Sequence, residues 1–223
     1  MPSRTYLPAV NSRLFLILFL SSLAAFGPIV TDFYLPVLPE QQTDFQTSAS
    51  MVQLGLTTTM WGLAVGQLLI GPISDVRGRR MPLAVSMIVF TAATLGAVLA
   101  PTIEAFVLFR FLEGLGAAGG IVMSRSVAAD VYGGKDLAVF MGIMGAVQGI
   151  APISAPMIGA VLGALMGWRG IFWLMLGIGV VLTVISLFVF RETRRPRPDE
   201  AARSPLRDVR TLMTNPLFFA IFL

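Results

Sequence analysis

Long apolar runs that alternate with short polar links constrain this chain more than any other feature. Each run has about the 20 residues that a helix needs to cross the bilayer's hydrocarbon core of about 30 Å. In lipid only helices and closed barrels satisfy every backbone hydrogen bond, and runs of this length indicate helices. We therefore predict an all-α polytopic membrane protein with six spans, Leu14–Leu35, Met51–Ile73, Met81–Ala100, Ala105–Ser124, Ala138–Leu162 and Gly170–Phe190.

The composition supports a membrane protein and excludes several kinds of chemistry. Hydrophobic residues make up 56% of the 223 residues and charged residues 13%, whereas soluble domains have about 25% charged residues. The basic pI of about 10.3 could suit a nucleic-acid partner, but the basic residues lie in short loops between apolar runs, so we expect none. Cysteine and histidine are absent, which removes thiol chemistry and the commonest metal ligand. We expect no metal and no cofactor, and any proton chemistry must use carboxylates.

The first apolar run allows a second interpretation. Arg4 and Arg13 precede Leu14–Phe26, an arrangement that a signal peptide also shows. The apolar character continues to Tyr34 and five more spans follow, so a retained first helix is the favoured interpretation.

Basic residues indicate the orientation of the spans. Arg169 lies in a predicted outer loop and Arg110 lies within a span, while the predicted outer loops also hold Glu40, Asp44 and Glu104. Because short cytoplasmic loops carry an excess of Lys and Arg, we expect both ends of the six-helix unit in the cytoplasm of a multi-pass cell-membrane protein. Fourteen of the 16 basic residues lie in the predicted inner segments: Arg4, Arg13, Arg77, Arg79, Arg80, Arg125, Lys135, Arg191, Arg194, Arg195, Arg197, Arg203, Arg207 and Arg210.

Three regions follow from this pattern. Residues 1–190 form the six-helix bundle, and residues 191–215 are rich in Arg and Pro and read as a flexible cytoplasmic linker. The same stretch could be a basic segment attracted to anionic lipid, and both interpretations can hold. Residues 216–223 restart an apolar run that would extend about 12 Å as a helix. We interpret it as the start of a seventh helix.

The link between the second and third spans carries a recognisable spacing, G-x-x-x-D-x-x-G-R-R. Its charges alone are typical of a solvated cytoplasmic turn. The spacing and its place in the chain resemble the signature loop of the major facilitator superfamily, with Val76 where that family often has a basic residue. The residues that match are Gly71, Asp75, Gly78, Arg79 and Arg80.

Three further stretches resemble drug:proton antiporters of the Bcr/CflA type within that superfamily. TDFYLPVLP places Asp32 at the family's acidic position, and RFLEGLGAA places Arg110 at an arginine implicated in proton coupling. Glu113 stands where glutamine is common. SRSVAADVY follows the family too, and the resemblance implies a cytoplasmic gate made by Gly71, Asp75, Gly78, Arg79, Arg80, Arg125 and Asp130.

Charges inside the spans are the strongest functional signal from the residues themselves. Asp32, Arg110 and Glu113 each cost at least about 2.5 kcal/mol at mid-bilayer on insertion scales. Asp32 and Arg110 lie at matching depths, and Glu113 shares a helix face with Arg110. One interpretation is a structural ion pair that joins two helices. The other is a proton-coupling carboxylate whose proton affinity desolvation raises and Arg110 lowers, so that it switches with the conformational state.

Small residues in the fourth and fifth spans have structural and functional interpretations. Gly114, Gly116 and Gly119 spell G-x-G-x-x-G, but no strand precedes them, so close helix packing is favoured over cofactor binding. In the fifth span small residues recur every four positions from Ala151 to Gly167, which generic packing also explains. That span resembles the superfamily's antiporter motif, through Gly145, Gly149, Ala155, Pro156 and Gly159.

The resemblance implies the N-terminal half of a twelve-helix transporter built from two inverted three-helix repeats. We expect proton-coupled efflux of small amphipathic compounds by alternating access, at a site completed by a missing C-terminal six-helix half, without which we expect no transport. A non-transporting fragment or an assembly subunit is the alternative; no arrangement of Ser or Asp indicates an enzyme. Candidates for the substrate cavity are Asp32, Tyr34, Met60, Trp61, Met144 and Gln148.

Overall fold

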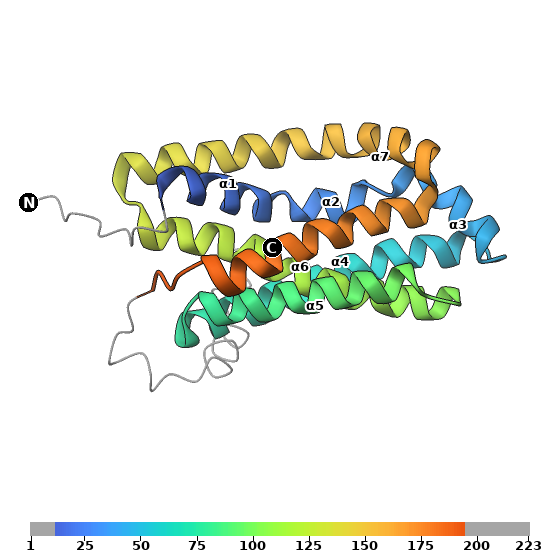
Figure 1. The fold of residues 1–223 in the computed structure, drawn as a ribbon, viewed down its shortest axis with the longest axis horizontal. Coiled ribbons are helices and arrows are strands. Elements are labelled where there is room, and N and C mark those ends of the chain that lie inside the picture. Colours follow the sequence, from blue (N-terminus) through green and yellow to red (C-terminus); the bar gives the residue numbers. More distant parts are fainter. Residues whose placement is uncertain (1–11, 195–223) are drawn as a thin grey trace, which may run out of the picture.

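The structure, a computed structural model, describes residues 12–194, and all regular structure in that range is helical (Figure 1). The predicted all-α class is confirmed, and five of the described helical segments are long and apolar enough to cross a membrane. The elements are α1 (Arg13–Ala24), α2 (Phe26–Asp32), the 3-10 helix η1 (Leu35–Val37), α3 (Leu38–Asp44), α4 (Ala49–Arg77), α5 (Arg80–Val98), α6 (Ile103–Val131), α7 (Gly134–Val184) and the π-helix η2 (Ile185–Val189).

Helix α7 accounts for both the fifth and the sixth predicted spans. Its backbone leaves helical geometry at Gly167, where φ is 70° and ψ is 179°, and Figure 1 shows the chain turning back on itself within α7. A positive φ of this kind favours glycine, because other residues would place Cβ against the backbone. We call residues 134–166 the first arm of α7 and residues 168–184 the second arm. Five segments thus give six passes through the bundle.

The first predicted span is broken into short pieces rather than one helix. It runs through α1, α2, η1 and α3 as far as Asp44, nine residues beyond its predicted end. Pro36 and Pro39 lie at the first turns of η1 and α3. Proline lacks a backbone N–H and restricts the residue before it, so each proline favours a new helical start.

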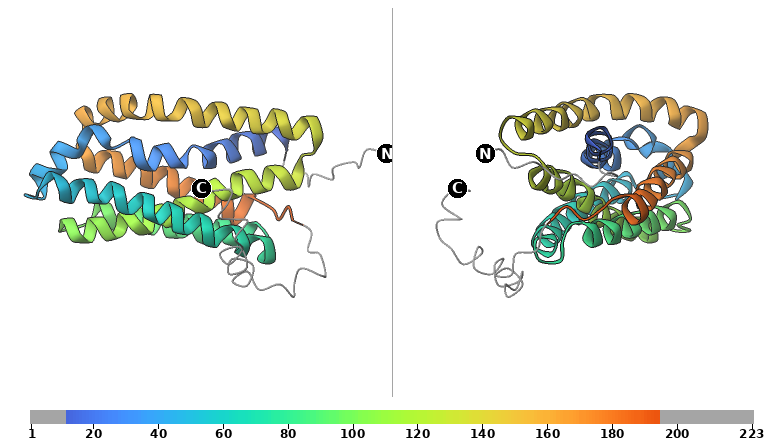
Figure 2. Two further views of the ribbon diagram at one scale, coloured as in Figure 1. Left: turned by 180° about the vertical axis from the view of Figure 1, so that it is seen from behind. Right: turned by 60° about the vertical axis from the view of Figure 1, so that its left-hand side comes forward.

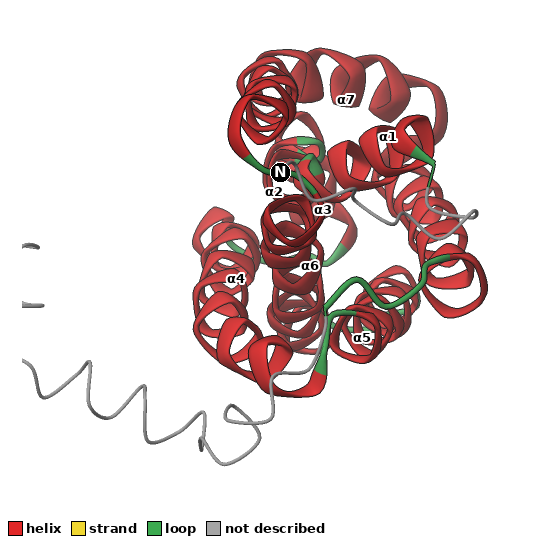
Figure 3. Ribbon diagram, turned by 90° about the vertical axis from the view of Figure 1, so that its left-hand side faces the viewer, coloured by secondary structure: helices red, strands yellow, loops and turns green. Residues whose placement is uncertain are grey.

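Helix α6 lies between α4 and α5, with α1 and α7 beyond it, when the bundle is seen end-on (Figure 3). Glycines allow this close approach. A Cβ on Gly114 would lie 2.2 Å from the Thr59 carbonyl oxygen of α4, and one on Gly116 would lie 2.4 Å from the Phe90 nitrogen of α5. The G-x-G-x-x-G spacing therefore serves helix packing inside α6, as small residues do in membrane bundles.

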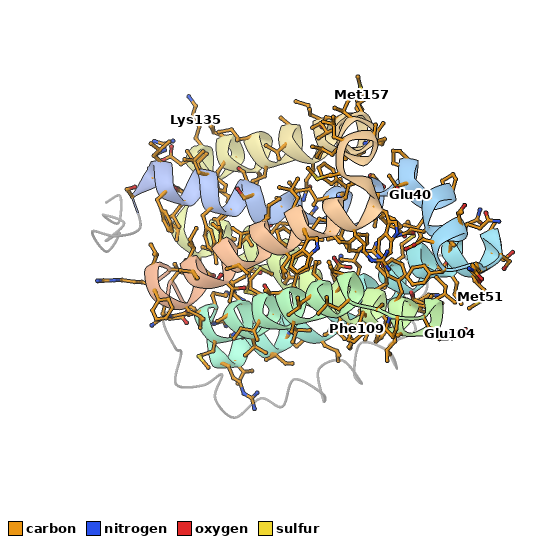
Figure 4. The ribbon with its side chains drawn as sticks, turned by 45° about the vertical axis from the view of Figure 1, so that its right-hand side comes forward. Glu40, Met51, Glu104, Phe109, Lys135 and Met157 are labelled. Atoms are coloured by element: carbon orange, nitrogen blue, oxygen red, sulfur yellow. The ribbon has the colours of Figure 1, made fainter. Side chains whose placement is uncertain are left out.

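Within residues 12–194, the predicted inner and outer segments lie at opposite ends of the bundle (Figures 1 and 2). Lys135 marks one end and Glu40 and Glu104 mark the other (Figure 4). We call them the Arg79 end and the Trp168 end. At the Trp168 end the second arm of α7 is joined to α3, because the Trp168 backbone N–H donates to Glu40 Oε2 at 3.0 Å and its indole Nε1 donates to Asp44 Oδ2 at 3.0 Å.

Part of the predicted organisation lies outside the described residues. That part comprises the N-terminal residues before Ser12, linker residues 195–215 and the predicted start of a seventh helix at 216–223. Linker residues 191–194 are described, and they lie against the link between α4 and α5.

Candidate functional site

A fully buried guanidinium lies at the centre of the candidate site. The side chain of Arg110, on α6, is 0% exposed. Its Nη1 donates to Glu113 Oε2 at 2.5 Å, and its Nη2 donates to the Val30 carbonyl oxygen of α2 at 2.6 Å. The ion pair therefore lies within one helix, at spacing i,i+3, while the bond to Val30 fixes α6 to the first span.

Two aromatic rings complete the surroundings of Arg110. Its Cζ lies 4.3 Å from the centroid of Tyr34 and 5.4 Å from that of Phe172, on the second arm of α7. A cation over an aromatic face is stabilised by the ring quadrupole, more so when water is excluded. Among the described residues, Arg110 Nε and the Tyr34 hydroxyl are buried without a hydrogen-bond partner. The guanidinium is thus held by one carboxylate, one carbonyl and two rings in a dry site.

Glu113 connects this site to α5. Its side chain is 0% exposed, and Oε1 lies 3.0 Å from the Thr94 hydroxyl oxygen. A buried charge is tolerated only when it is paired and hydrogen-bonded. Arg110 and Thr94 together supply that condition, one to each carboxylate oxygen.

Asp32 lies beside this site rather than in it. It is half-buried, and its Oδ1 accepts a hydrogen bond from the Thr31 hydroxyl at 2.8 Å. Asp32 follows Val30 by two residues, so it stands close to the backbone that Arg110 already contacts. Among the described residues, however, the carboxylate that pairs with Arg110 is Glu113 and not Asp32.

The predicted cavity residues do not gather around one hollow. Tyr34 lies against Arg110, and Met144 is buried. Gln148 Oε1 accepts from Arg125 Nη2 at 3.1 Å, so this predicted gate residue contacts a predicted cavity residue. Met60 and Trp61 are 51% and 64% exposed on α4.

A groove of about 750 Å³ lies elsewhere, between α1 and the second arm of α7. It is lined by Phe15, Leu18, Phe19, Ser22, Trp173, Leu174, Gly177, Ile178, Val181, Leu182 and Ile185.

The structure brings three predicted gate residues together at the Arg79 end. Arg79 Nε donates to Asp130 Oδ2 at 2.7 Å, and its Nη1 donates to Asp75 Oδ1 at 2.8 Å and to Ser74 Oγ at 2.7 Å. Burial alone would lower the pKa of the Arg79 guanidinium, but hydrogen bonds and charges from Asp130 and Asp75 outweigh it and hold that pKa above its ordinary value. Arg79 therefore stays charged throughout the physiological pH range.

Besides Ser74, sequence reasoning missed two members of this cluster at the start of the predicted linker. The backbone N–H groups of Arg79 and Arg80 donate to the Glu192 carboxylate at 2.8 and 3.0 Å, and Arg194 Nη1 donates to Asp75 Oδ1 at 2.7 Å. Glu192 thereby caps the first turn of α5, where free N–H groups favour an anion. A glutamate between arginines, directly after the last span, was the available signal.

Gly78 has a geometric reason to be glycine, whereas Gly71 does not. The φ of Gly78 is 85°, and a Cβ there would lie 2.6 Å from Glu192 Oε2. A side chain would therefore strain the backbone and displace the cap of α5. A Cβ on Gly71 would meet nothing within 4 Å.

The predicted antiporter motif divides into two parts. A Cβ on Gly159 would lie 2.0 Å from the Phe33 carbonyl oxygen, so the first arm of α7 approaches the first span closely there. Ala155, one turn earlier, is buried, and Pro156 beside it is half-buried. A Cβ on Gly145 or Gly149 would meet nothing within 4 Å. Packing thus explains Ala155 and Gly159, whereas a side chain at Gly145 or Gly149 would meet no neighbour in the described structure.

The family of the chain follows from comparison with known proteins. Residues 14–223 match the profile of the Major Facilitator Superfamily. The chain belongs to that superfamily. It is 39% identical over 188 residues to the uncharacterized MFS-type transporter YdgK of Bacillus subtilis, which covers 83% of this chain and 47% of the relative.

Two drug-resistance proteins are also similar to this superfamily member. A chloramphenicol resistance protein of Pseudomonas aeruginosa is 34% identical over 183 residues, covering 81% of this chain and 43% of that protein. Multidrug resistance protein MdtL of Salmonella paratyphi C is 31% identical over 179 residues, covering 79% and 45%. The chain spans about half the length of the curated relatives it matches.

Solved structures support the same fold. A bacterial homolog of the human lysosomal transporter Spinster, inward-facing and unoccupied, superposes with a TM-score of 0.71 at 21% identity, covering 93% of this chain and 50% of that one. The human organic anion transporter MFSD10 gives a TM-score of 0.67 at 17% identity, with coverages of 91% and 53%. At these identities the likeness shows the fold alone.

Proposed function

We propose that this superfamily member forms half of a proton-coupled exporter of small amphipathic compounds in the cell membrane, with its N-terminus in the cytoplasm. The observation that carries the proposal is the dry Arg110–Glu113 pair held beside Asp32. A buried ionisable group is costly in a membrane and marks a functional site by default. The drug-resistance names of two relatives support the class of substrate. The transport site would form where this bundle meets a second six-helix half.

Arg110 is placed to exchange carboxylate partners. Its Nη1 contacts Glu113, while its Nη2 contacts the carbonyl of Val30, two residues before Asp32. A small movement of α2 relative to α6 would bring Asp32 toward the same guanidinium. The carboxylate that Arg110 leaves would then bind a proton more readily, because an adjacent cation favours the ionised form. Proton binding and helix movement would thus be linked.

The Arg79 cluster has the features of a conformational lock at the cytoplasmic surface. It joins the end of α4, the end of α6 and the residues after η2 through Arg79, Asp75, Asp130 and Glu192. It lies at the end of the bundle, far from Arg110 along α6. We propose that it sets the rate of the conformational switch and does not bind substrate. The superfamily is one of transporters, so we assign no catalytic residue and no cofactor.

Transport by an Asp32→Asn variant tests this function. The variant is made in the complete transporter, reconstituted in proteoliposomes and driven by a pH gradient. We expect normal insertion and folding but no proton-driven transport, because the amide cannot carry a proton. Asp136→Asn is the matched control, since Asp136 is an exposed acid paired with Arg13. Normal pH-driven transport by Asp32→Asn would end its assignment as a proton carrier.

A further inference from the structure

The Thr94 hydroxyl lies between two acceptors. Thr94 is 0% exposed on α5, and its Oγ1 lies 2.8 Å from the Phe90 carbonyl oxygen and 3.0 Å from Glu113 Oε1. A hydroxyl has one proton to donate and two lone pairs to accept with. Thr94 can therefore donate to only one of these oxygens at a time, and a rotation about its Cβ–Oγ1 bond changes which one.

The two oxygens of Glu113 face different partners. Oε2 accepts from Arg110 Nη1 at 2.5 Å, whereas Oε1 faces Thr94 on the neighbouring helix. A proton on Oε2 would point at a guanidinium that has only donors. A proton on Oε1 would point at a hydroxyl oxygen that can accept it. The geometry thus favours Oε1 as the atom that binds a proton.

We propose that Thr94 is a positioning residue that keeps Glu113 hydrogen-bonded in both protonation states. When Glu113 is ionised, Thr94 donates to Oε1. When a proton binds to Oε1, the new O–H donates to Thr94, and Thr94 donates to the Phe90 carbonyl. One O–H bond forms, only the hydroxyl turns, and no bond between heavy atoms breaks. The use of this proton in transport rests on the proposed function.

The charged surroundings of Glu113 link its proton to Arg110. Arg110 on α6 is the charged group that contacts Glu113 among the described residues, and the Tyr34 ring lies against that guanidinium. From α5 the polar contact is Thr94, and the second arm of α7 contributes the apolar ring of Phe172. Asp32 faces Thr31. Protonating Glu113 would leave Arg110 without its carboxylate, so the protonated state requires Arg110 to find another anion.

An infrared titration of the full 223-residue chain in lipid nanodiscs tests the proposal. The C=O band of protonated Glu113 is identified as the band that a Glu113→Gln variant lacks. Thr94→Val removes the hydroxyl at nearly constant volume, and Thr94→Ser keeps it. Thr59→Val is the matched control, because Thr59 is also buried, and its hydroxyl donates to the Gly55 carbonyl of its own helix at 2.7 Å.

We expect the Glu113 band to titrate over the same pH range in the native chain, in Thr94→Ser and in Thr59→Val. Thr94→Val should bind the Glu113 proton about tenfold more tightly, because a hydrogen bond to an ionised group is stronger than one to a neutral group. Its C=O band should also change position. If Thr94→Val fails to fold by circular dichroism, Thr94→Ala removes the same hydroxyl.

Two results would overturn the proposal: a Thr94→Val titration identical to that of Thr59→Val, or no Glu113 band across the physiological pH range. Neither measurement requires transport. A titration that depends on Thr94, together with transport that does not depend on the proton gradient, would retain Thr94 as the positioning residue and reject the proton-coupled function.

Discussion

The chain buries two arginines in contrasting ways. Arg110 lies in a dry site with one carboxylate, one carbonyl and two aromatic rings, and both partners of its ion pair are 0% exposed. Arg79 lies at the end of the bundle with two carboxylates and a serine, and the Asp75 side chain in its cluster is 56% exposed. At the first site one arginine is paired with one carboxylate, and both side chains are held in place by buried neighbours. The second lies at a solvent-exposed edge, where Asp75 also pairs with Arg194.

The contrast matters because the surroundings set the strength of each interaction. Coulomb energies rise as the local dielectric falls, and a buried pair that loses one partner leaves an uncompensated charge. Exposed pairs contribute about 0–1 kcal/mol and are weakened by salt. Substituting Arg110 should therefore reduce the stability of the bundle strongly and to the same extent at any salt concentration. Substitutions in the Arg79 cluster should cause smaller losses that depend on salt.

The largest effect is expected at Arg110. Arg110→Gln should destabilise the bundle by about 3–5 kcal/mol, because Glu113 would be left charged and buried without a partner. The double variant Arg110→Gln/Glu113→Gln removes both charges and should recover much of that loss. Unfolding in mixed micelles with increasing denaturing detergent measures both. Additive losses in the double variant would show that the two side chains do not act as a pair.

A smaller effect is expected at Arg79. Arg79→Gln removes hydrogen bonds to Asp75 and Asp130, and hydrogen bonds to charged groups contribute about 1.5–3 kcal/mol. In the complete transporter it should slow turnover while substrate affinity stays within a few fold, because the cluster lies far from Arg110. Asp75→Asn should act in the same direction. Loss of affinity with unchanged turnover would instead place the cluster at the substrate site.

Much of the fold could be predicted from the sequence because the bilayer leaves few choices. The apolar runs predicted the helical spans, and Gly78 and the charges around it predicted a turn at one end. The break at Gly167 falls between the fifth and sixth predicted spans, which end at Leu162 and begin at Gly170. The positive φ of Gly167 itself was not predicted, because small residues at four-residue spacing from Ala151 to Gly167 indicate one helical ridge. The short helices after Leu35 required knowing that Pro36 and Pro39 begin new helical turns.

The candidate site was only partly predictable. Sequence spacing placed Glu113 on the same face as Arg110, and matching depth suggested Asp32 as the partner of Arg110. The structure favours Glu113 because a partner at i,i+3 needs no movement of a second helix. Thr94 could not be identified, since it acts through a contact with a residue on another helix. Glu192 had only its place directly after the last span as a signal, because its partners are distant in the chain.

Substituting Glu192 tests the Arg79 cluster without removing an arginine. Its carboxylate accepts hydrogen bonds from the backbone N–H groups of Arg79 and Arg80 and so caps the N-terminus of α5. Losing such a cap costs about 1 kcal/mol. Glu192→Ala should destabilise the chain by about that amount, and Glu192→Gln, which keeps an acceptor, by less. Equal losses in thermal unfolding would show that charge, and not capping, gives Glu192 its effect.

The smallest effect, and the one that separates the two arginine sites most clearly, is the salt dependence of Asp75→Asn. The Asp75 side chain is 56% exposed, against 21% for that of Asp130, and Arg79 keeps Asp130 when Asp75 is neutralised. The loss should be at most about 1 kcal/mol at low ionic strength. It should shrink toward zero at high salt, because the Debye length falls from about 10 Å at 0.1 M to about 3 Å at 1 M. Arg110→Gln, measured in parallel by the same unfolding assay, should show the same loss at both salt concentrations, since its partners are out of reach of ions. A salt-independent loss for Asp75→Asn would mean that the Arg79 cluster is as dry as the Arg110 site, and the distinction between the two would fail.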